Sequence, residues 1–206
     1  MKKTIIYSTP IWSYQIDNFE LSKDKFISSC KEYKNSNQKL NTKDSSTVNG
    51  YQTSDELHTK EDLSNIFETI CMIAYNAGKD LNFSEFEIGI RSSWVNFNSS
   101  RSEFNHPHSH TGIFSGVVYL NSPENSGNLC IINPGYNPLW EGNFLVKENY
   151  KGEHTSECLK ISPEEGMVYI WPSYLMHYVE PNNHDGERIS ISFKIEMNPI
   201  EVGSDE

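Results

Sequence analysis

The sequence lacks long hydrophobic runs, paired cysteines and an excess of positive charge, and each absence argues against a class of protein. No apolar stretch approaches the roughly 20 residues that a membrane-spanning helix needs. The four cysteines form no Cys-x-x-Cys pair, so neither a disulfide framework nor a zinc–thiolate site is expected. With 17 basic and 28 acidic residues the net charge is −11, which disfavours a nucleic-acid or anionic-membrane partner. We therefore expect a soluble protein of the reducing cytoplasm that binds no nucleic acid and no membrane.

Aromatic residues make up 12% of the chain, which is enough to build a core although the hydrophobic fraction is only 36%. In the N-terminal part, apolar residues at three- and four-residue steps predict a helix over 54–81 and a weaker one over 22–33. The first 17 residues predict a strand that is broken at Pro10, and residues 35–52 predict a long polar loop.

After residue 82 the apolar period changes from helical to two, which is typical of strands. Strands are predicted at 86–97, 113–121, 128–132, 157–161, 167–171, 175–180 and 188–196. In the last of these, four apolar residues from Ile189 to Ile195 alternate with polar ones, which predicts one buried face and one face in water. Residues 135–155, with Tyr136, Trp140 and Phe144, predict a loop over the barrel mouth, either closing the barrel end or acting as a lid.

The order of these elements predicts the fold class. Short strands that follow one or two helices are typical of a mostly β jelly roll or cupin-like barrel with a helical buttress. We expect a single domain over residues 1–206, with the buttress at about 20–81 and the jelly-roll core at about 84–196. The apolar N-terminal strand could also pair between chains, which would give a homo-oligomer.

Histidines are the clearest candidates for chemistry. Three of the seven lie in the segment Asn105-His106-Pro107-His108-Ser109-His110, and His177 lies in an apolar stretch where an imidazole needs a partner. Residues i and i+2 of a strand share a face, so a His-x-His pair can offer two imidazoles to one ion. Neutral imidazole suits Fe, Cu, Ni and Zn. The segment Arg188-Ile189-Ser190 follows His177 by eleven residues.

These motifs in this order resemble the Fe(II)/2-oxoglutarate oxygenases, in particular a branch common in bacteria and tailed phages whose members are related to prolyl-hydroxylase-like dioxygenases. The segments that resemble the family motifs are Tyr7–Trp12, Glu103–Asn105, His108–Gly112, Ser115–Leu120, Gly166–His177 and Glu187–Phe193. They run through nearly the whole chain. In the middle ligand position, where most of the superfamily has Asp or Glu, this sequence has His, as the branch does.

Two histidine pairs fit the His-x-His pattern, and the residue between each pair separates them. Pro107 lies inside the pair His106/His108, and proline is unfavourable where a strand needs a hydrogen-bond donor. Ser109 carries no such penalty, and the residues after His110 have the spacing that the resemblance implies. We therefore favour His108 and His110, with His106 as the alternative ligand or as a residue of the entrance or second shell.

The resemblance implies a non-haem Fe(II)- and 2-oxoglutarate-dependent dioxygenase on a double-stranded β-helix, with release of succinate and CO2. It implies that the metal is held by His108, His110 and His177, with no further catalytic residue. Arg188 and Ser190 would bind the far carboxylate of 2-oxoglutarate, where the planar guanidinium fork matches a carboxylate. Tyr119 is either a co-substrate contact or a core aromatic, and Asn96 either faces the cavity or is structural.

Two alternatives to this function remain at the level of sequence. One is a cupin-like metalloprotein, although a cupin usually has a Glu soon after its His pair and residues 111–115 contain none. The other is a jelly-roll binding module without catalysis or 2-oxoglutarate. If the oxygenase interpretation holds, O2 is the second co-substrate and the oxidised partner is a peptide side chain or a small metabolite. A phage-encoded chain would work in the host cytoplasm.

Overall fold

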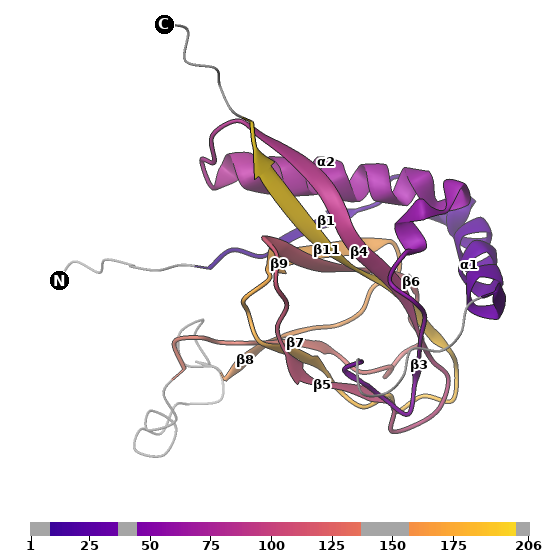
Figure 1. The fold of residues 1–206 in the computed structure, drawn as a ribbon. Coiled ribbons are helices and arrows are strands. Elements are labelled where there is room, and N and C mark those ends of the chain that lie inside the picture. Colours follow the sequence, from indigo (N-terminus) through magenta and orange to yellow (C-terminus); the bar gives the residue numbers. More distant parts are fainter. Residues whose placement is uncertain (1–8, 37–44, 137–156, 201–206) are drawn as a thin grey trace, which may run out of the picture.

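A computed structural model describes residues 9–36, 45–136 and 157–200, and in these segments the chain forms two β-sheets and two long helices (Figure 1). The six-stranded sheet has the order β1-β9-β6-β11-β4-β3, and the five-stranded sheet has the order β2-β5-β10-β7-β8. All strand pairs within the two sheets are antiparallel. The predicted class, mostly β with N-terminal helices, is confirmed.

The strands that carry the site lie mostly where the period-two pattern predicts them. The larger sheet contains β1 (Trp12–Gln15), β3 (Tyr51–Gln52), β4 (Phe86–Asn98), β6 (Phe114–Asn121), β9 (Met167–Pro172) and β11 (Arg188–Pro199). The smaller sheet contains β2 (Thr47–Val48), β5 (Phe104–His108), β7 (Leu129–Ile132), β8 (Cys158–Ile161) and β10 (His177–Val179). The two short strands β2 and β3 lie in the segment predicted as a loop, and β5 was not among the predicted strands.

The helices differ from their predicted bounds at both ends. Helix α1 (Phe19–Ser36) is longer than the predicted 22–33, and α2 (Ser64–Asp80) begins ten residues later than the predicted start at 54. The segment between the predicted and the observed start of α2 contains two 3-10 turns, Leu57–Thr59 and Glu61–Leu63. Leu57 and Leu63 are fully buried, so the apolar spacing continued through a segment that packs into the core without being α-helical.

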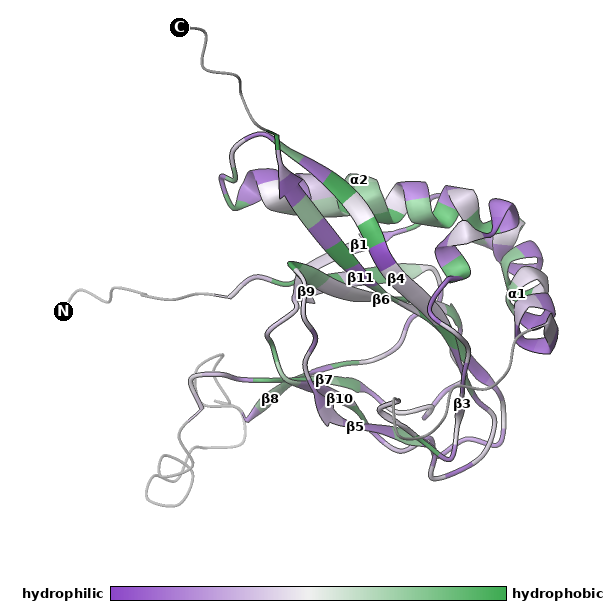
Figure 2. Cartoon of the chain, in the orientation of Figure 1, coloured by the Kyte–Doolittle hydropathy of each residue, from purple (hydrophilic) through white to green (hydrophobic). Residues whose placement is uncertain are grey.

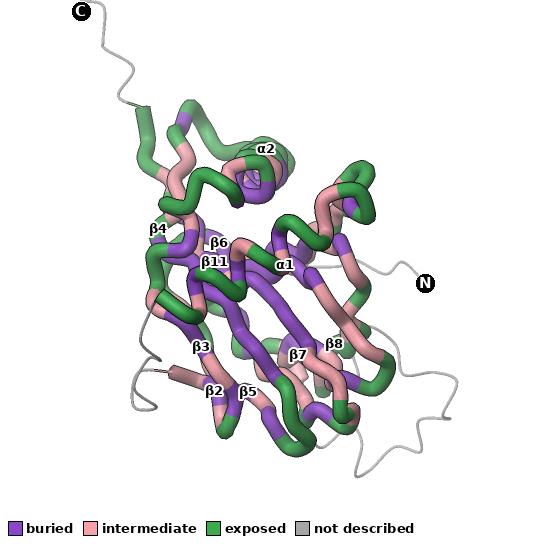
Figure 3. The backbone as a smooth tube through the Cα atoms, turned by 90° about the vertical axis from the view of Figure 1, so that its right-hand side faces the viewer, coloured by how far each residue is buried: buried purple, intermediate pink, exposed green. Residues whose placement is uncertain are grey.

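The helices cover the outer face of the six-stranded sheet, and the five-stranded sheet faces its other side (Figure 1). Side chains therefore form two separate cores. On β6, Val118 and Leu120 pack toward the helices with Ile66 and Ile70, whereas Val117 belongs to a smaller cluster between the sheets. Buried backbone runs through the sheet beneath the exposed outer turns of the helices (Figure 3).

Contrary to the prediction, the polar residues that alternate with apolar ones along β11 do not all face water. Ile189 and Ile191 pack toward the helices, as expected, and polar and apolar colours alternate along β4 and β11 in Figure 2. The polar face, however, is not in water at its first positions: Arg188 is 2% exposed and Ser190 5%. This face lines the space between the two sheets. The prediction of a solvated face was wrong because water and a polar cavity impose the same sequence pattern.

The N-terminal strand β1 pairs with β9 of the same chain and forms one edge of the larger sheet. Pairing between chains stays a prediction. The predicted mouth loop at 135–155 lies almost entirely outside the described residues. No helix within the described segments is long and apolar enough to cross a membrane.

Candidate metal centre

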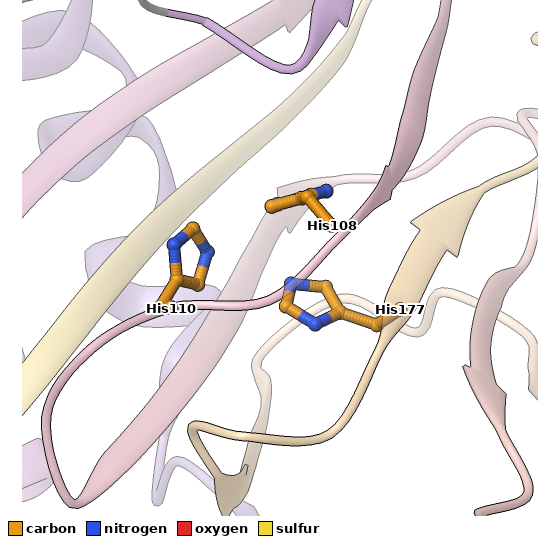
Figure 4. A group of neighbouring side chains, drawn as sticks. All are labelled: His108, His110 and His177. Carbon is orange, nitrogen blue, oxygen red and sulfur yellow. The ribbon is translucent and has the colours of Figure 1, made fainter.

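Three histidines from separate places in the small sheet and its connections meet between the two sheets (Figure 4). His108 ends β5, His110 follows in the connection to β6, and His177 begins β10. One possible ligand atom from each lies within 4.8 Å of the others. Ring centroids are 4.3 Å apart for His108 and His177, 4.8 Å for His108 and His110, and 5.2 Å for His110 and His177.

A β-bulge in β5 turns His108 into this space. His108 pairs with His177 and Asn105 pairs with Val179. Between these two pairs β5 therefore has one residue more than β10. The extra residue changes which face later side chains point to. His106 is consequently exposed, whereas Asn105 and His108 both line the cavity.

Pro107 lies within this bulge, inside β5. Bulges are among the places where sheets accept proline, so Pro107 does not by itself rule out the pair His106/His108. His106 does have a role at the site, but through its main chain: its carbonyl oxygen lies 2.6 Å from Nδ1 of His108.

His110 lies outside β5, which ends at His108. The two imidazoles therefore do not lie at positions i and i+2 of one strand, although the His-x-His pattern predicts that arrangement. Its backbone N–H donates to the carbonyl of Ser173 at 3.0 Å, which ties this connection to the segment before β10. Its ring packs edge-on to Trp94, with centroids 5.8 Å apart. An aromatic wall and a backbone bond thus fix its position.

Main-chain carbonyls select one tautomer for two of the rings. Nδ1 of His177 lies 2.9 Å from the carbonyl oxygen of Leu175, and Nδ1 of His108 has the carbonyl of His106. A carbonyl can only accept, so in both neutral rings Nδ1 carries the proton and Nε2 keeps a free lone pair. Hydrogen bonds of this kind, to the ring nitrogen that does not bind the metal, orient metal-ligating histidines in proteins.

Burial keeps all three imidazoles uncharged at neutral pH. It lowers the pKa of His110 to about 3 and that of His177 to about 4, and the mutual repulsion that these rings would have if protonated adds to the effect in both. The pKa of His108 is also lowered, chiefly by burial. Neutral imidazole is the form that coordinates a metal ion.

The cavity that contains the histidines extends along the inner faces of β4, β6 and β11. Tyr119, Ser190, Asn96 and Arg188, all predicted from the sequence as site residues, line it. Ser190 and Tyr119 are directly paired across β11 and β6, and Arg188 lies on the same face as Ser190. Asn96 donates from Nδ2 to Ser192 Oγ at 2.9 Å. The structure thus brings the predicted residues to one cavity, apart from the exposed ring of His106.

Arg188 is a buried cation, and no carboxylate of the described segments pairs with it. Nη1 donates to the carbonyls of Ser126 at 2.7 Å and Gly127 at 3.3 Å, and Nη2 donates to Asn98 Oδ1 at 2.8 Å. Nε has no hydrogen-bond partner in the described part of the chain. Burial lowers the pKa of the guanidinium, while Tyr119 and the carboxylate of Glu103 oppose the shift. No described acidic group lies within ion-pair distance of it.

Several residues of the cavity were not found from the sequence. Asn98 holds Arg188, and Trp94 and Trp171 form walls beside His110 and His177. The indole Nε1 of Trp171 is buried without a partner among the described residues. Trp94 and Asn98 were detectable in principle, since they continue on β4 the same alternation that was recognised on β11.

Comparison with protein families gives one match. A family model described as "Putative 2OG-Fe(II) oxygenase" matches residues 92–194, which is half of the chain and includes all three histidines and Arg188. No curated protein sequence matches the chain.

Solved structures of low sequence identity share the fold. A prolyl-4-hydroxylase from Pseudomonas putida is 13% identical with a TM-score of 0.59, over 91% of this chain and 93% of that one. HygX from Streptomyces hygroscopicus, crystallised with nickel, 2-oxoglutarate and hygromycin B, is 10% identical with a TM-score of 0.60, over 94% and 84%. A Trichoplax adhaerens prolyl hydroxylase in complex with a peptide fragment is 13% identical with a TM-score of 0.59, over 89% and 81%. The two facing sheets are therefore a double-stranded β-helix.

Proposed function

Because this chain belongs to the family of 2-oxoglutarate- and Fe(II)-dependent oxygenases, we propose that His108, His110 and His177 hold its iron and that Arg188 binds its 2-oxoglutarate. The observation that carries the proposal is the convergence of three uncharged imidazoles in the cavity that also contains a buried, unpaired guanidinium. The first group is suited to the metal and the second to a dicarboxylate.

The histidines fit a ferrous ion by their chemistry. Imidazole nitrogen suits iron, and three protein ligands leave further coordination positions for co-substrates. Nε2 of His108 and of His177 is available without any change of tautomer, because the carbonyls of residues 106 and 175 already hold the Nδ1 protons. At neutral pH the ion has no proton to displace from these rings.

Arg188 fits the far carboxylate of 2-oxoglutarate. A buried charge without a counterion costs free energy, and an anionic ligand removes that cost. Nε–H and one Nη2–H remain after the bonds to Ser126, Gly127 and Asn98, so two donors are available to a carboxylate. The hydroxyl of Ser190 lies on the same face and can add a third.

When bound, Fe(II) supplies the activation of O2 that couples decarboxylation of 2-oxoglutarate to oxidation of a substrate, with release of succinate and CO2. The chain's own residues bind and orient. The histidines fix the metal, Arg188 and Ser190 fix the keto acid at the far end, and Trp94, Trp171 and Val117 exclude water from the space between. We infer that the reaction is a hydroxylation of a peptide side chain or a small metabolite.

The metal assignment is tested by Fe(II) stoichiometry under anaerobic conditions. His177→Ala removes one of three ligands and should lose most of the bound iron. His58→Ala is the matched control, because the His58 ring lies away from the cavity and bonds to Ser93 Oγ. Full iron occupancy in His177→Ala would disprove the assignment.

The co-substrate assignment is tested by titrating 2-oxoglutarate into the metal-loaded protein. Arg188→Lys keeps the charge but loses the planar fork, and a charge-assisted hydrogen bond contributes about 1.5–3 kcal/mol. Affinity for 2-oxoglutarate should fall by roughly 10- to 150-fold while iron binding stays the same. Ser190→Ala should have a smaller effect in the same direction. A cupin-like protein or a bare binding module would not bind 2-oxoglutarate at all.

A further inference from the structure

The inner face of β11 carries a second cation, Lys194, at the opposite end from Arg188. Arg188, Ser190, Ser192 and Lys194 alternate with the residues that pack on the helices. Six residues of strand separate the two cations by about 20 Å. Arg188 is held at one end of this face by the carbonyls of Ser126 and Gly127, so Lys194 lies toward the other end of the barrel.

Lys194 stands beside the metal centre. Its Nζ lies over the ring of Trp94, 5.4 Å from the centroid, and Trp94 also packs against His110. Its strand neighbour on β6 is Ser115, whose hydroxyl bonds to Ser173 Oγ at 2.8 Å. The charge of Lys194 contributes to the lowered pKa of both His108 and His110.

The ammonium group of Lys194 has unused hydrogen-bonding capacity. Within the described segments the side chain of Lys194 forms no ion pair and no hydrogen bond, and its ammonium group contacts only the ring of Trp94. An ammonium has three N–H donors, and a ring face satisfies none of them fully. Directly opposite on β4 lies Ser92, 8% exposed, whose Oγ is buried without a partner among the described residues.

The surroundings of Lys194 contain little negative charge. Asp55 is the acidic group whose charge interacts with it, but Asp55 is exposed and lies beyond ion-pair distance. No Asp or Glu is among the described residues that line the cavity. In a protein whose net charge is −11, the cavity contains Arg188 and three uncharged histidines, and the half-buried Lys194 stands at its edge over Trp94. Such a site attracts an anion.

We propose that Lys194 is the substrate-binding cation of this oxygenase, and that it receives the carboxylate or phosphate group of a small anionic substrate beside the three histidines. The hydroxyls of Ser92 and Ser115 flank this anion subsite, and Trp94 forms its wall. The substrate class rests on the proposed function, whereas the anion subsite itself does not require it. An acidic polypeptide is disfavoured, because the net charge of the protein would repel its many charges at long range.

The experiment compares acids with amides of the same size. The probes are acetate and acetamide, phenylacetate and phenylacetamide, and N-acetylglycine and its amide, with phenyl phosphate to separate phosphate from carboxylate. Dissociation constants are measured by ligand-observed NMR on the Zn(II)-loaded protein, with and without 2-oxoglutarate. In the wild type, at least one acid should bind 10- to 150-fold more tightly than its amide, as expected for one charge-assisted contact.

Three variants assign that preference to Lys194. Lys194→Gln should abolish the preference for the acid, and Lys194→Arg should restore most of it. Lys160→Gln, which removes the same charge from an exposed residue that pairs with Glu180, should leave it unchanged. Binding of 2-oxoglutarate, measured on the same samples, should stay within about twofold of the wild type in Lys194→Gln.

The outcomes separate the two proposals. Equal affinities for acid and amide in every pair, or a preference that survives in Lys194→Gln, would overturn the anion subsite even where 2-oxoglutarate binds normally. Absence of 2-oxoglutarate binding together with a preference that depends on Lys194 would overturn the proposed function and leave the subsite standing.

Discussion

Asn98→Asp is the most informative change at the end of the cavity where Arg188 lies. Asn98 is fully buried and is paired with Arg188 across β4 and β11, with Oδ1 accepting from Nη2 at 2.8 Å. Its Nδ2 has no hydrogen-bond partner in the described part of the chain, so exchanging that nitrogen for oxygen removes no bond. The substitution is isosteric and gives the buried guanidinium an internal counterion.

Two effects of opposite sign follow. In the free protein, a neutral hydrogen bond worth about 0.5–1.5 kcal/mol becomes a charge-assisted one worth about 1.5–3 kcal/mol. We therefore expect stability equal to the wild type or higher by about 1 kcal/mol. For 2-oxoglutarate, a second carboxylate about 5 Å away at an effective dielectric constant of 20 repels the bound one by about 3 kcal/mol. Affinity should fall by roughly 150-fold.

The assay combines urea unfolding of the ligand-free protein with anaerobic titration of Fe(II) and then 2-oxoglutarate. Asn198→Asp is the control, since it adds the same charge at the exposed far end of β11 and should change neither quantity. Iron stoichiometry should match the wild type in both variants. If Asn98→Asp binds 2-oxoglutarate with wild-type affinity, Arg188 does not hold the co-substrate.

Two further predictions concern the scaffold. In Gly116→Ala the new Cβ would overlap the ring of Phe193, so we expect the free energy of unfolding in urea to fall by about 1–3 kcal/mol. In Gly89→Ala the nearest atom is 3.5 Å from the new Cβ, so the free energy of unfolding should fall less, and equal losses would refute the packing argument. Burial acts to raise the pKa of Glu165, but the hydrogen bonds from Lys23 and from the backbone N–H of Ser122, together with the charge of Lys23, outweigh burial and hold the pKa below its ordinary value. Glu165→Gln should therefore cost about 0.2–1 kcal/mol at pH 7, a difference that shrinks as pH falls through the lowered pKa, and an equal difference at pH 7 and pH 3.5 would contradict the assignment.

The sequence predicted the strands of the core well because most of them carry a strict alternation, and alternation is a local property. It predicted less well where tertiary contacts decide. The buried Leu57 continues an apolar period that looks helical, yet its segment folds as a 3-10 turn. The bulge at Pro107 depends on pairing between β5 and β10, which are almost 70 residues apart, so the exposed position of His106 could not be read locally.

The partners of the cavity residues show the same limit. Arg188 was predicted from a short motif, but Asn98 and the carbonyls of Ser126 and Gly127 come from distant segments. Lys194 belonged to an alternation that was interpreted as a solvated face. Only the closure of the two sheets around that face distinguishes a polar cavity from a polar surface.

The orientation of His108 and His177 depends on backbone oxygens two residues earlier, at positions 106 and 175. A side-chain partner can be deleted by a single codon change, whereas a main-chain acceptor is present whichever amino acid occupies its position. His106→Ala should therefore keep the proton of His108 on Nδ1. The two rings are therefore aligned by the course of the chain itself, and no neighbouring side chain has to be in place to hold them.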